Sequence, residues 1–115
     1  MGAKRKRIKT VGAQGDVMFV RVDALPEDVK PRAATGKIIV AHSETGHHHS
    51  IAADGRVEAF DTADPFVCYL QASIGFDVVH ERPFDMHKTL RLGRGVWQVK
   101  RQREYTPAGF RMVQD

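Results

Sequence analysis

Short runs of apolar residues, separated at frequent intervals by turn-forming residues, are the dominant pattern along this chain. The runs are rich in Val, Ile and Phe, which suit the half-buried surface of a pleated sheet. Many short strands divided by turn signals are typical of a β-sandwich or a β-barrel. We therefore predict a mostly β fold, a small single-domain β-barrel or β-sandwich, with strands over residues 16–23, 37–44, 47–53, 56–62, 76–81, 88–92 and 96–105.

Gly, Pro and Asp mark the turns and loops between these strands. Residues 24–36 contain two prolines and scattered charges, so we predict a loop there, with one helical turn at residues 26–28. Residues 45–46, Thr-Gly, are predicted to turn the chain between the second and third strands. Residues 54–55, Asp-Gly, are a strong two-residue hairpin signal, which predicts a hairpin between the third and fourth strands.

Residues 64–75 fit two alternatives. Asp64 as an N-cap, Pro65 in the first helical position and Gly75 after the end would bound a short helix. The run Phe-Val-Cys-Tyr-Leu over residues 66–70 instead favours a strand. We predict a strand, because the neighbouring elements are all β.

The bulk composition indicates one globular domain. A chain of 115 residues with 42% hydrophobic and 28% charged residues can bury a modest core. No apolar run approaches the ~20 residues of a membrane span, and no apolar segment follows the N-terminal charges, so we expect neither a membrane protein nor a secretory signal. Cys68 is the one cysteine, which excludes an intrachain disulfide and fits a reducing compartment.

The positive charge is concentrated at the N-terminus. The formal net charge is +4, but five positive charges fall within the first nine residues, so the rest of the chain has a net charge of −1. We predict a basic N-terminal arm over residues 1–10 and a single β domain over residues 11–115. Such an arm is typical of a tail that binds DNA, RNA or an acidic protein, and a solvated tail is the alternative. The candidate binding residues are Lys4, Arg5, Lys6, Arg7 and Lys9, with Arg101 and Arg103 as a second basic cluster.

The segment 41–50, which contains four histidines, is the most unusual feature of the sequence. If residues 45–46 form a two-residue loop, the strands on either side pair directly. Because strand side chains alternate between faces, one face of this hairpin then carries His42, Glu44, His47 and His49, while His48 points away. Directly opposed Cβ atoms lie ~5 Å apart, which is close enough for two or three of these groups to share one metal ion.

Imidazole and carboxylate groups together suit a divalent transition metal such as Zn, Fe, Ni or Mn. His80 and His87 could each complete a site with His47 and His49, leaving one coordination position open. The alternative is that these histidines are exposed turn residues or hydrogen-bonded structural groups. Both alternatives stay open at the level of the sequence.

The strand predicted over residues 96–105 alternates between two faces. One face carries Trp97, Val99, Arg101, Arg103 and Tyr105. Arginines interleaved with aromatic residues can contact a phosphate backbone and stack on bases. The alternative, which we favour, is a structural network of ion pairs with Glu81, Asp85 or Glu104.

The histidine pattern, followed by the run Gly-Val-Trp-Gln-Val-Lys-Arg-Gln-Arg-Glu-Tyr-Thr-Pro over residues 95–107, resembles a group of small uncharacterised proteins encoded by phages and plasmids. The similarity runs from about Gln14 to Asp115, and its most specific part is residues 101–105. The resemblance implies a mobile-element origin and no particular activity. It implies a location in the cytoplasm of a host cell or in a virion.

The His-x-His pair formed by His47 and His49 is also similar to the opening of the cupin motif, which implies a metal held inside a small β-barrel. The cupin motif continues with a Glu four or five residues later, whereas the next Glu here is Glu58, nine residues after His49. The later Pro-x-Gly-x-x-His element of cupins does not occur in this sequence.

Three functions follow from these observations. The first, which we favour, is an accessory or virion protein of a phage or prophage, with a structural or binding role and a histidine metal site. We expect its arm to dock on a polyanion, a capsid or another phage protein, and we expect that the protein can form a homo-oligomer. The second is a cupin-like metal-dependent enzyme, and the third is a nucleic-acid-binding module. The sequence has no Gly-x-Ser-x-Gly, phosphate loop or Cys-x-x-Cys motif, so we assign no catalytic residue.

Overall fold

The computed structural model describes the side chains of most of the chain and the backbone course of two C-terminal strands. Side chains are described for residues 5–33, 36–41, 48–52, 55–80 and 89–101, and the backbone alone for residues 103–106 and 109–112. These residues form two sheets and a separate hairpin, and no helix occurs among them. No helix that could cross a membrane is found in the described part of the chain.

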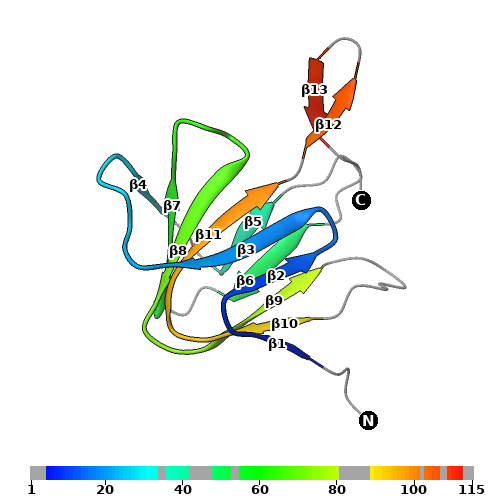
Figure 1. The fold of residues 1–115 in the computed structure, drawn as a ribbon. Coiled ribbons are helices and arrows are strands. Elements are labelled where there is room, and N and C mark those ends of the chain that lie inside the picture. The colour runs from blue at the N-terminus through cyan, green and yellow to red at the C-terminus, as the bar shows by residue number, and fades with distance from the viewer. Residues whose placement is uncertain are drawn as a thin grey trace.

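The first sheet has five strands (Figure 1). In spatial order they are β1 (Lys6–Ile8), β10 (Leu90–Leu92), β9 (Phe76–His80), β6 (His49–Ala52) and β5 (Lys37–Ala41). β1 and β10 pair in parallel, and the other neighbours pair antiparallel. Residues 6–8 therefore belong to the sheet, within the range that the sequence analysis assigned to the arm.

The second sheet has six strands, and all of its pairs are antiparallel. In spatial order they are β2 (Val11–Gln14), β3 (Val17–Val22), β11 (Gly95–Arg101), β8 (Val67–Ala72), β7 (Val57–Asp61) and β4 (Lys30–Arg32). The remaining strands, β12 (Arg103–Thr106) and β13 (Gly109–Met112), form a two-stranded hairpin that projects beyond the two sheets in Figure 1.

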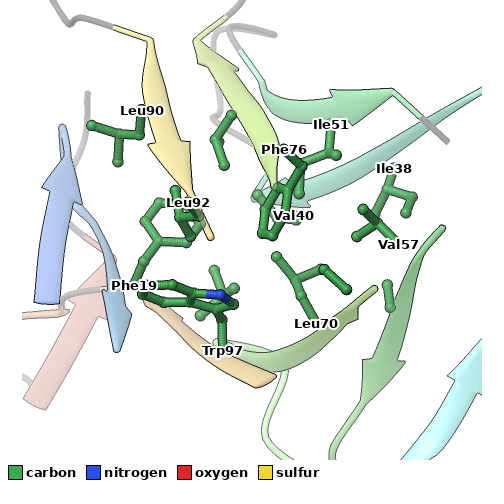
Figure 2. Close-up of a cluster of buried hydrophobic side chains, with 14 of the residues drawn as sticks. Phe19, Ile38, Val40, Ile51, Val57, Leu70, Phe76, Leu90, Leu92 and Trp97 are labelled. Carbon is green, nitrogen blue, oxygen red and sulfur yellow. The ribbon is translucent and has the colours of Figure 1, made fainter. Parts of the chain in front are cut away.

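The core lies between the two sheets, which makes the arrangement sandwich-like (Figure 2). The alternating strand positions supply it: β3 contributes Phe19, β11 contributes Trp97 and Val99, and the facing sheet contributes Phe76 and Leu92, each buried. The Trp97 indole nitrogen donates a hydrogen bond to the Gly93 carbonyl oxygen at 2.9 Å, so its polar group is satisfied inside the core.

The structure confirms the all-β fold and corrects several predicted details. Among the described strands neither sheet closes on itself, so these strands fit the sandwich alternative and not the barrel. Residues 67–72 form a strand, as predicted. The predicted loop over residues 24–36 contains β4, with its Arg32 held by β7, and the segment before residue 16 contains β2.

The predicted hairpin at residues 54–55 is wrong. β6 and β7 lie in different sheets, so the chain passes there from one layer to the other. An Asp-Gly pair favours a tight change of direction, but that local signal does not decide whether the two flanking strands pair with each other. Each strand forms its backbone hydrogen bonds with other neighbours: β6 pairs with β5 and β9, and β7 pairs with β8 and β4.

Two further predictions of strand extent and register need correction. The single strand predicted over residues 96–105 is divided into β11, in the second sheet, and β12, in the separate hairpin. In the β5–β6 pair, His49 lies opposite Ala41, one position away from the predicted partner His42. Ser50 lies opposite Ile39, two positions away from its predicted partner Ala41, and a bulge between Ile39 and Ala41 adds one residue on β5, which reduces the offset to one position at His49.

Candidate functional site

Five polar residues from four strands and one turn converge at one end of the two sheets, and we call this set the histidine end. It consists of Gln14, Asp16, His49, His80 and Arg101, all of which are buried. Gln14 and Asp16 flank the β2–β3 turn, His49 begins β6, His80 ends β9 and Arg101 ends β11. The antiparallel pairing of these strands brings their ends together, and each side chain occupies an inward position.

His49 is held by a hydrogen bond whose direction can be deduced. Its Nδ1 lies 2.8 Å from Gln14 Oε1, while Gln14 Nε2 donates to the Val78 carbonyl oxygen at 3.0 Å. A carbonyl oxygen can only accept, so the amide of Gln14 is fixed with its oxygen toward the ring. His49 Nδ1 must therefore carry the proton and donate it. The other ring nitrogen, Nε2, faces Asp16 Oδ1 at 3.8 Å.

His49 and His80 face each other across neighbouring strands. They are directly paired in the β6–β9 register, and their rings are stacked with centroids 4.2 Å apart and 9° from parallel. His49 is completely buried and His80 is 3% exposed. Two imidazoles enclosed in this way require polar partners, which Gln14 and Asp16 supply on the His49 side.

Asp16 connects the histidine pair to β11 of the second sheet. Its Oδ2 lies 3.5 Å from Arg101 Nη2, and both side chains are at least nine-tenths buried. A buried carboxylate is tolerated when an opposite charge pairs with it, and here the Arg101 guanidinium does so, while the His49 ring lies beside the other carboxylate oxygen. Arg101 is thus an interior ion-pair partner of Asp16, whereas the partners named from the sequence, Glu81, Asp85 and the side chain of Glu104, lie outside the described residues.

The second charged region lies at the opposite end of β3 and β11, and we call it the basic corner. It consists of exposed cations from three neighbouring segments: Lys6, Arg7, Lys9, Arg21 and Arg94. The Arg21 backbone nitrogen donates to the Thr10 carbonyl oxygen at 2.7 Å, next to Lys9. The Arg21 guanidinium lies over the Trp97 ring, 6.0 Å from its centroid, beside the turn that carries Arg94.

The cations of the basic corner differ from the neighbouring arginines Arg5 and Arg91, which have an acidic partner. Arg5 and Arg91 both pair with Asp77, at 3.4 Å each. Within the described residues, no acidic side chain pairs with the five cations of the basic corner. Their charges are therefore available to an external anion.

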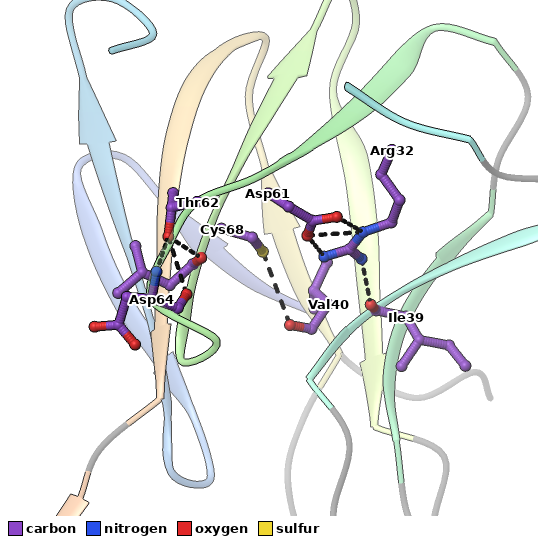
Figure 3. A network of polar contacts seen from close by, with 8 residues as sticks. Arg32, Ile39, Val40, Asp61, Thr62, Asp64 and Cys68 are labelled. Carbon is purple, nitrogen blue, oxygen red and sulfur yellow. Dashed lines mark hydrogen bonds and ion pairs between the residues drawn. The ribbon is translucent and has the colours of Figure 1, made fainter. Parts of the chain in front are cut away.

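A third polar network joins the outer strands of the two sheets (Figure 3). The Arg32 guanidinium on β4 binds the Asp61 carboxylate, with Nε to Oδ1 at 3.0 Å, and donates from Nη1 to the Ile39 carbonyl oxygen at 2.7 Å. The hydrogen bonds from Arg32 hold the pKa of Asp61 below its ordinary value, and Asp61 raises the pKa of Arg32. Burial raises the pKa of the nearby Cys68 thiol to about 11, so this thiol is neutral at physiological pH.

Comparison with protein families assigns the chain to one family. Residues 13–102 match the model of a domain of unknown function, DUF8820. The chain belongs to this family. No curated protein and no solved structure matches it. The matched range contains the whole histidine end and, from the basic corner, Arg21 and Arg94; Lys6, Arg7 and Lys9 precede it.

The structure brings together only two of the residues predicted to bind a metal. His49 and His80 are brought together, while His42, Glu44, His47 and His87 lie outside the described residues. Within the described part of the chain, no group of three or more His, Cys, Asp or Glu side chains is arranged to hold a metal ion. Lys4 also lies outside the described residues, as does the side chain of Arg103.

Sequence reasoning missed Gln14 and Asp16. Both lie beside the β2–β3 turn, where polar residues are ordinary and carry no signal of burial. Their role depends on contacts over long sequence separations, 35 residues from Gln14 to His49 and 64 residues to Val78. Arg21 was missed as well, because its exposed place over Trp97 depends on the pairing of β3 with β11, which no local pattern encodes.

Proposed function

We propose that this protein is an accessory or virion protein of a phage or prophage that binds nucleic acid through the basic corner. The observation that carries the proposal is the convergence of Lys6, Arg7, Lys9, Arg21 and Arg94 without acidic partners among the described residues. Clustered cations on one face bind the phosphate backbone by displacing condensed counterions. No sequence preference is implied, because phosphate contacts fix position and carry no base information.

The structure extends the charged region beyond the N-terminal segment. Lys6 and Arg7 lie on a strand of the first sheet, Arg21 lies on β3 of the second sheet, and Arg94 lies in the β10–β11 turn, which joins the two sheets. Cations held on ordered strands lose little conformational freedom on binding, unlike those of a free tail. The corner is therefore a surface with defined spacing between charges.

The test is binding of a fluorescently labelled 20-base-pair DNA duplex, followed by anisotropy over a range of salt concentrations. The slope of log K against log salt should be close to −0.9 for each phosphate contact, or roughly −3 to −5 for the basic corner. Lys9→Gln with Arg94→Gln should make this slope less steep by about 2. A matched control, Lys30→Gln with Lys100→Gln, removes the same charge from exposed positions elsewhere and should leave the slope within about 0.5 of the wild-type value.

Equal effects of the two double variants would contradict the proposal, because the binding would then depend on net charge and not on the corner. Salt-independent binding would also contradict it, since counterion release is the physical basis of the interaction. If the duplex does not bind and the protein instead co-sediments with phage particles, the basic corner docks on a capsid or another phage protein.

A divalent metal at the histidine end is a second candidate, favoured by the orientation of His49. Gln14 fixes Nδ1 as the proton-bearing nitrogen, which leaves Nε2 as the ring atom that could bind a metal. An imidazole whose other nitrogen donates to an oxygen is the usual arrangement of a histidine ligand. Asp16 Oδ1 lies 3.8 Å from Nε2, a few tenths of an ångström more than the roughly 3.3–3.6 Å between two ligands of a tetrahedral ion, so a small inward movement of the carboxylate would let both atoms bind one Zn, Fe, Ni or Mn ion.

Elemental analysis of untagged protein, purified without added metal, tests this second candidate. We expect about one equivalent of a transition metal, and its loss in the His49→Ala variant with His80→Ala. His48→Ala is the control and should retain the metal. Protein without metal, both as purified and after incubation with Zn²⁺, would contradict the metal site. Bound metal would justify a screen for a metal-dependent enzymatic activity.

A further inference from the structure

A hollow runs along the outer edge of β5, between the two sheets; it is separate from the basic corner and adjoins the histidine end at Arg101. Its volume is about 590 Å³. Its walls come from β5, from the end of β7 with the turn that follows, and from the start of β8, and Arg101 closes one side. A volume of 300–1,000 Å³ is the ordinary size of a pocket for a small organic molecule.

The lining combines an apolar wall with positive charge. Ile39, Phe66 and Val67 contribute apolar surface, and Lys37 and Arg101 contribute cations. Arg32 also lines the hollow, but its charge is matched by Asp61 (Figure 3). The lining includes three cations and two carboxylates, those of Asp61 and Asp64, and Arg101 is also paired with Asp16, which does not line the hollow.

Arg101 provides a buried donor at this hollow. Its side chain is 9% exposed, and its backbone nitrogen bonds to the Phe66 carbonyl oxygen at 2.9 Å, which fixes the end of β11 beside the wall of the hollow. Nη2 pairs with Asp16, but Nε has no hydrogen-bond partner within the described part of the chain. A buried N–H group without an acceptor is unfavourable, so Arg101 retains a hydrogen-bonding capacity that the described residues do not use.

We propose that this hollow binds a small organic carboxylate, with its carboxylate on Arg101 and its apolar body against Phe66 and Ile39. Guanidinium and carboxylate form charge-assisted hydrogen bonds, which are roughly twice as strong as those between neutral groups. The apolar wall selects a ligand with a hydrocarbon portion over a bare inorganic anion. The site is independent of the basic corner, which lies at the other end of β11.

The test uses the full-length ¹⁵N-labelled protein and 4-phenylbutyrate as the probe, with 4-phenylbutan-1-ol as its neutral counterpart. We expect saturable shifts with a Kd of about a millimolar, as is usual for a ligand of this size. The Arg101 Nε–H signal should move during the titration with 4-phenylbutyrate and stay unchanged with the alcohol. Backbone shifts should map to residues 37–41 and 61–68.

Two variants and a control make the site assignment specific. Arg101→Lys keeps the charge, removes Nε–H and should weaken binding at least tenfold. Phe66→Ala leaves the buried ion pair intact and should weaken binding several-fold, which keeps the test valid if the first variant does not fold. Ile74→Ala alters a half-buried residue of a different hollow and should leave the Kd unchanged. Equal binding of acid and alcohol, an unmoved Arg101 Nε–H signal, or no shifts at ~10 mM probe, well above the expected Kd, would overturn the proposal.

Discussion

The rings of His49 and His80 lie parallel, 4.2 Å apart between centroids, on two neighbouring strands of the first sheet. This contact is the centre of the histidine end, because His49 also reaches Gln14 and Asp16 in the second sheet. The imidazole of His49 thus connects the two layers where the apolar core ends. Each partner of this ring is a buried group, so removing one partner leaves a buried polar atom without its contact, which lowers the stability of the fold.

Replacing His80 tests the energetic value of the stacked pair. His80→Ala removes a buried ring and leaves a void against His49, so we expect the free energy of unfolding in urea to fall by about 2–4 kcal/mol. His80→Phe retains a flat ring and should lose less. Val79→Ala is the control on the same strand, because Val79 is 43% exposed, and it should cost under about 0.5 kcal/mol. Similar losses for His80→Ala and Val79→Ala would show that the stacked pair does not contribute to stability.

The protonated nitrogen of His49 is open to direct measurement. Long-range ¹H–¹⁵N spectra should show a proton on Nδ1, because that nitrogen donates to Gln14 Oε1. Gln14→Leu removes both the acceptor for His49 and the donor to the Val78 carbonyl oxygen, so we expect a loss of about 2–3 kcal/mol and exchange broadening of the Nδ1 proton. Ala13→Leu, at the exposed neighbouring position, is the control. A His49 ring protonated only on Nε2 would contradict the hydrogen-bond direction deduced here.

The sequence allowed the fold class and most strands to be predicted, because period-two alternation and β-branched residues are local signals. Residues 17–22, 37–41, 57–61 and 67–72 are strands within the predicted ranges. β4 could not be predicted in the same way, because its three residues include Pro31 and it is held by pairing with β7. The hairpin at residues 54–55 was wrong because the choice of pairing partner depends on which layer each strand joins.

The candidate site could be predicted only to the level of residue type. The alternation along residues 49–51 correctly places His49 on the inward face with Ile51. His80 was one of two further candidates, and its position opposite His49 depends on the β6–β9 register, which no local pattern encodes. The contact of Asp16 with Arg101 joins residues far apart in the chain. It needed the three-dimensional fold, in which β3 pairs with β11 and brings Val17 opposite Arg101.

Two glycines beside the basic corner should respond differently to alanine. Gly95 has φ of +134°, and a Cβ there would lie 2.9 Å from Arg21 Nη2. Gly95→Ala should therefore lower the free energy of unfolding by about 1–3 kcal/mol and displace the Arg21 guanidinium from Trp97. Gly93→Ala is the matched control: its Cβ would lie 4.0 Å from Arg21 Nη1, so it should cost under about 1 kcal/mol. Both are measured by urea denaturation, with Trp97 fluorescence as the local readout. Equal costs would mean that Arg21 does not approach Gly95 in solution.

Cys68 should make the fold sensitive to alkaline pH. Its thiol is buried near the Val40 carbonyl oxygen, and desolvation raises its pKa from 9.0 to about 11 in the folded protein. Below pH 9 the thiol is neutral in both folded and unfolded chains and has no effect on pH dependence. Between pH 9 and 11 the unfolded chain loses the proton first, so the folded state loses roughly 2 kcal/mol relative to the unfolded state by pH 11.

The comparison that isolates this effect is the stability of wild type and Cys68→Ala across the same pH range. The variant is expected to be less stable at pH 7, because it leaves a small void, and to lose less stability than wild type between pH 9 and 11. Iodoacetamide should modify the native thiol far more slowly at pH 8 than the same thiol in urea, since the thiolate is the reactive form. Parallel alkaline curves for the two proteins, or rapid modification of the native protein, would contradict a buried neutral thiol at this position.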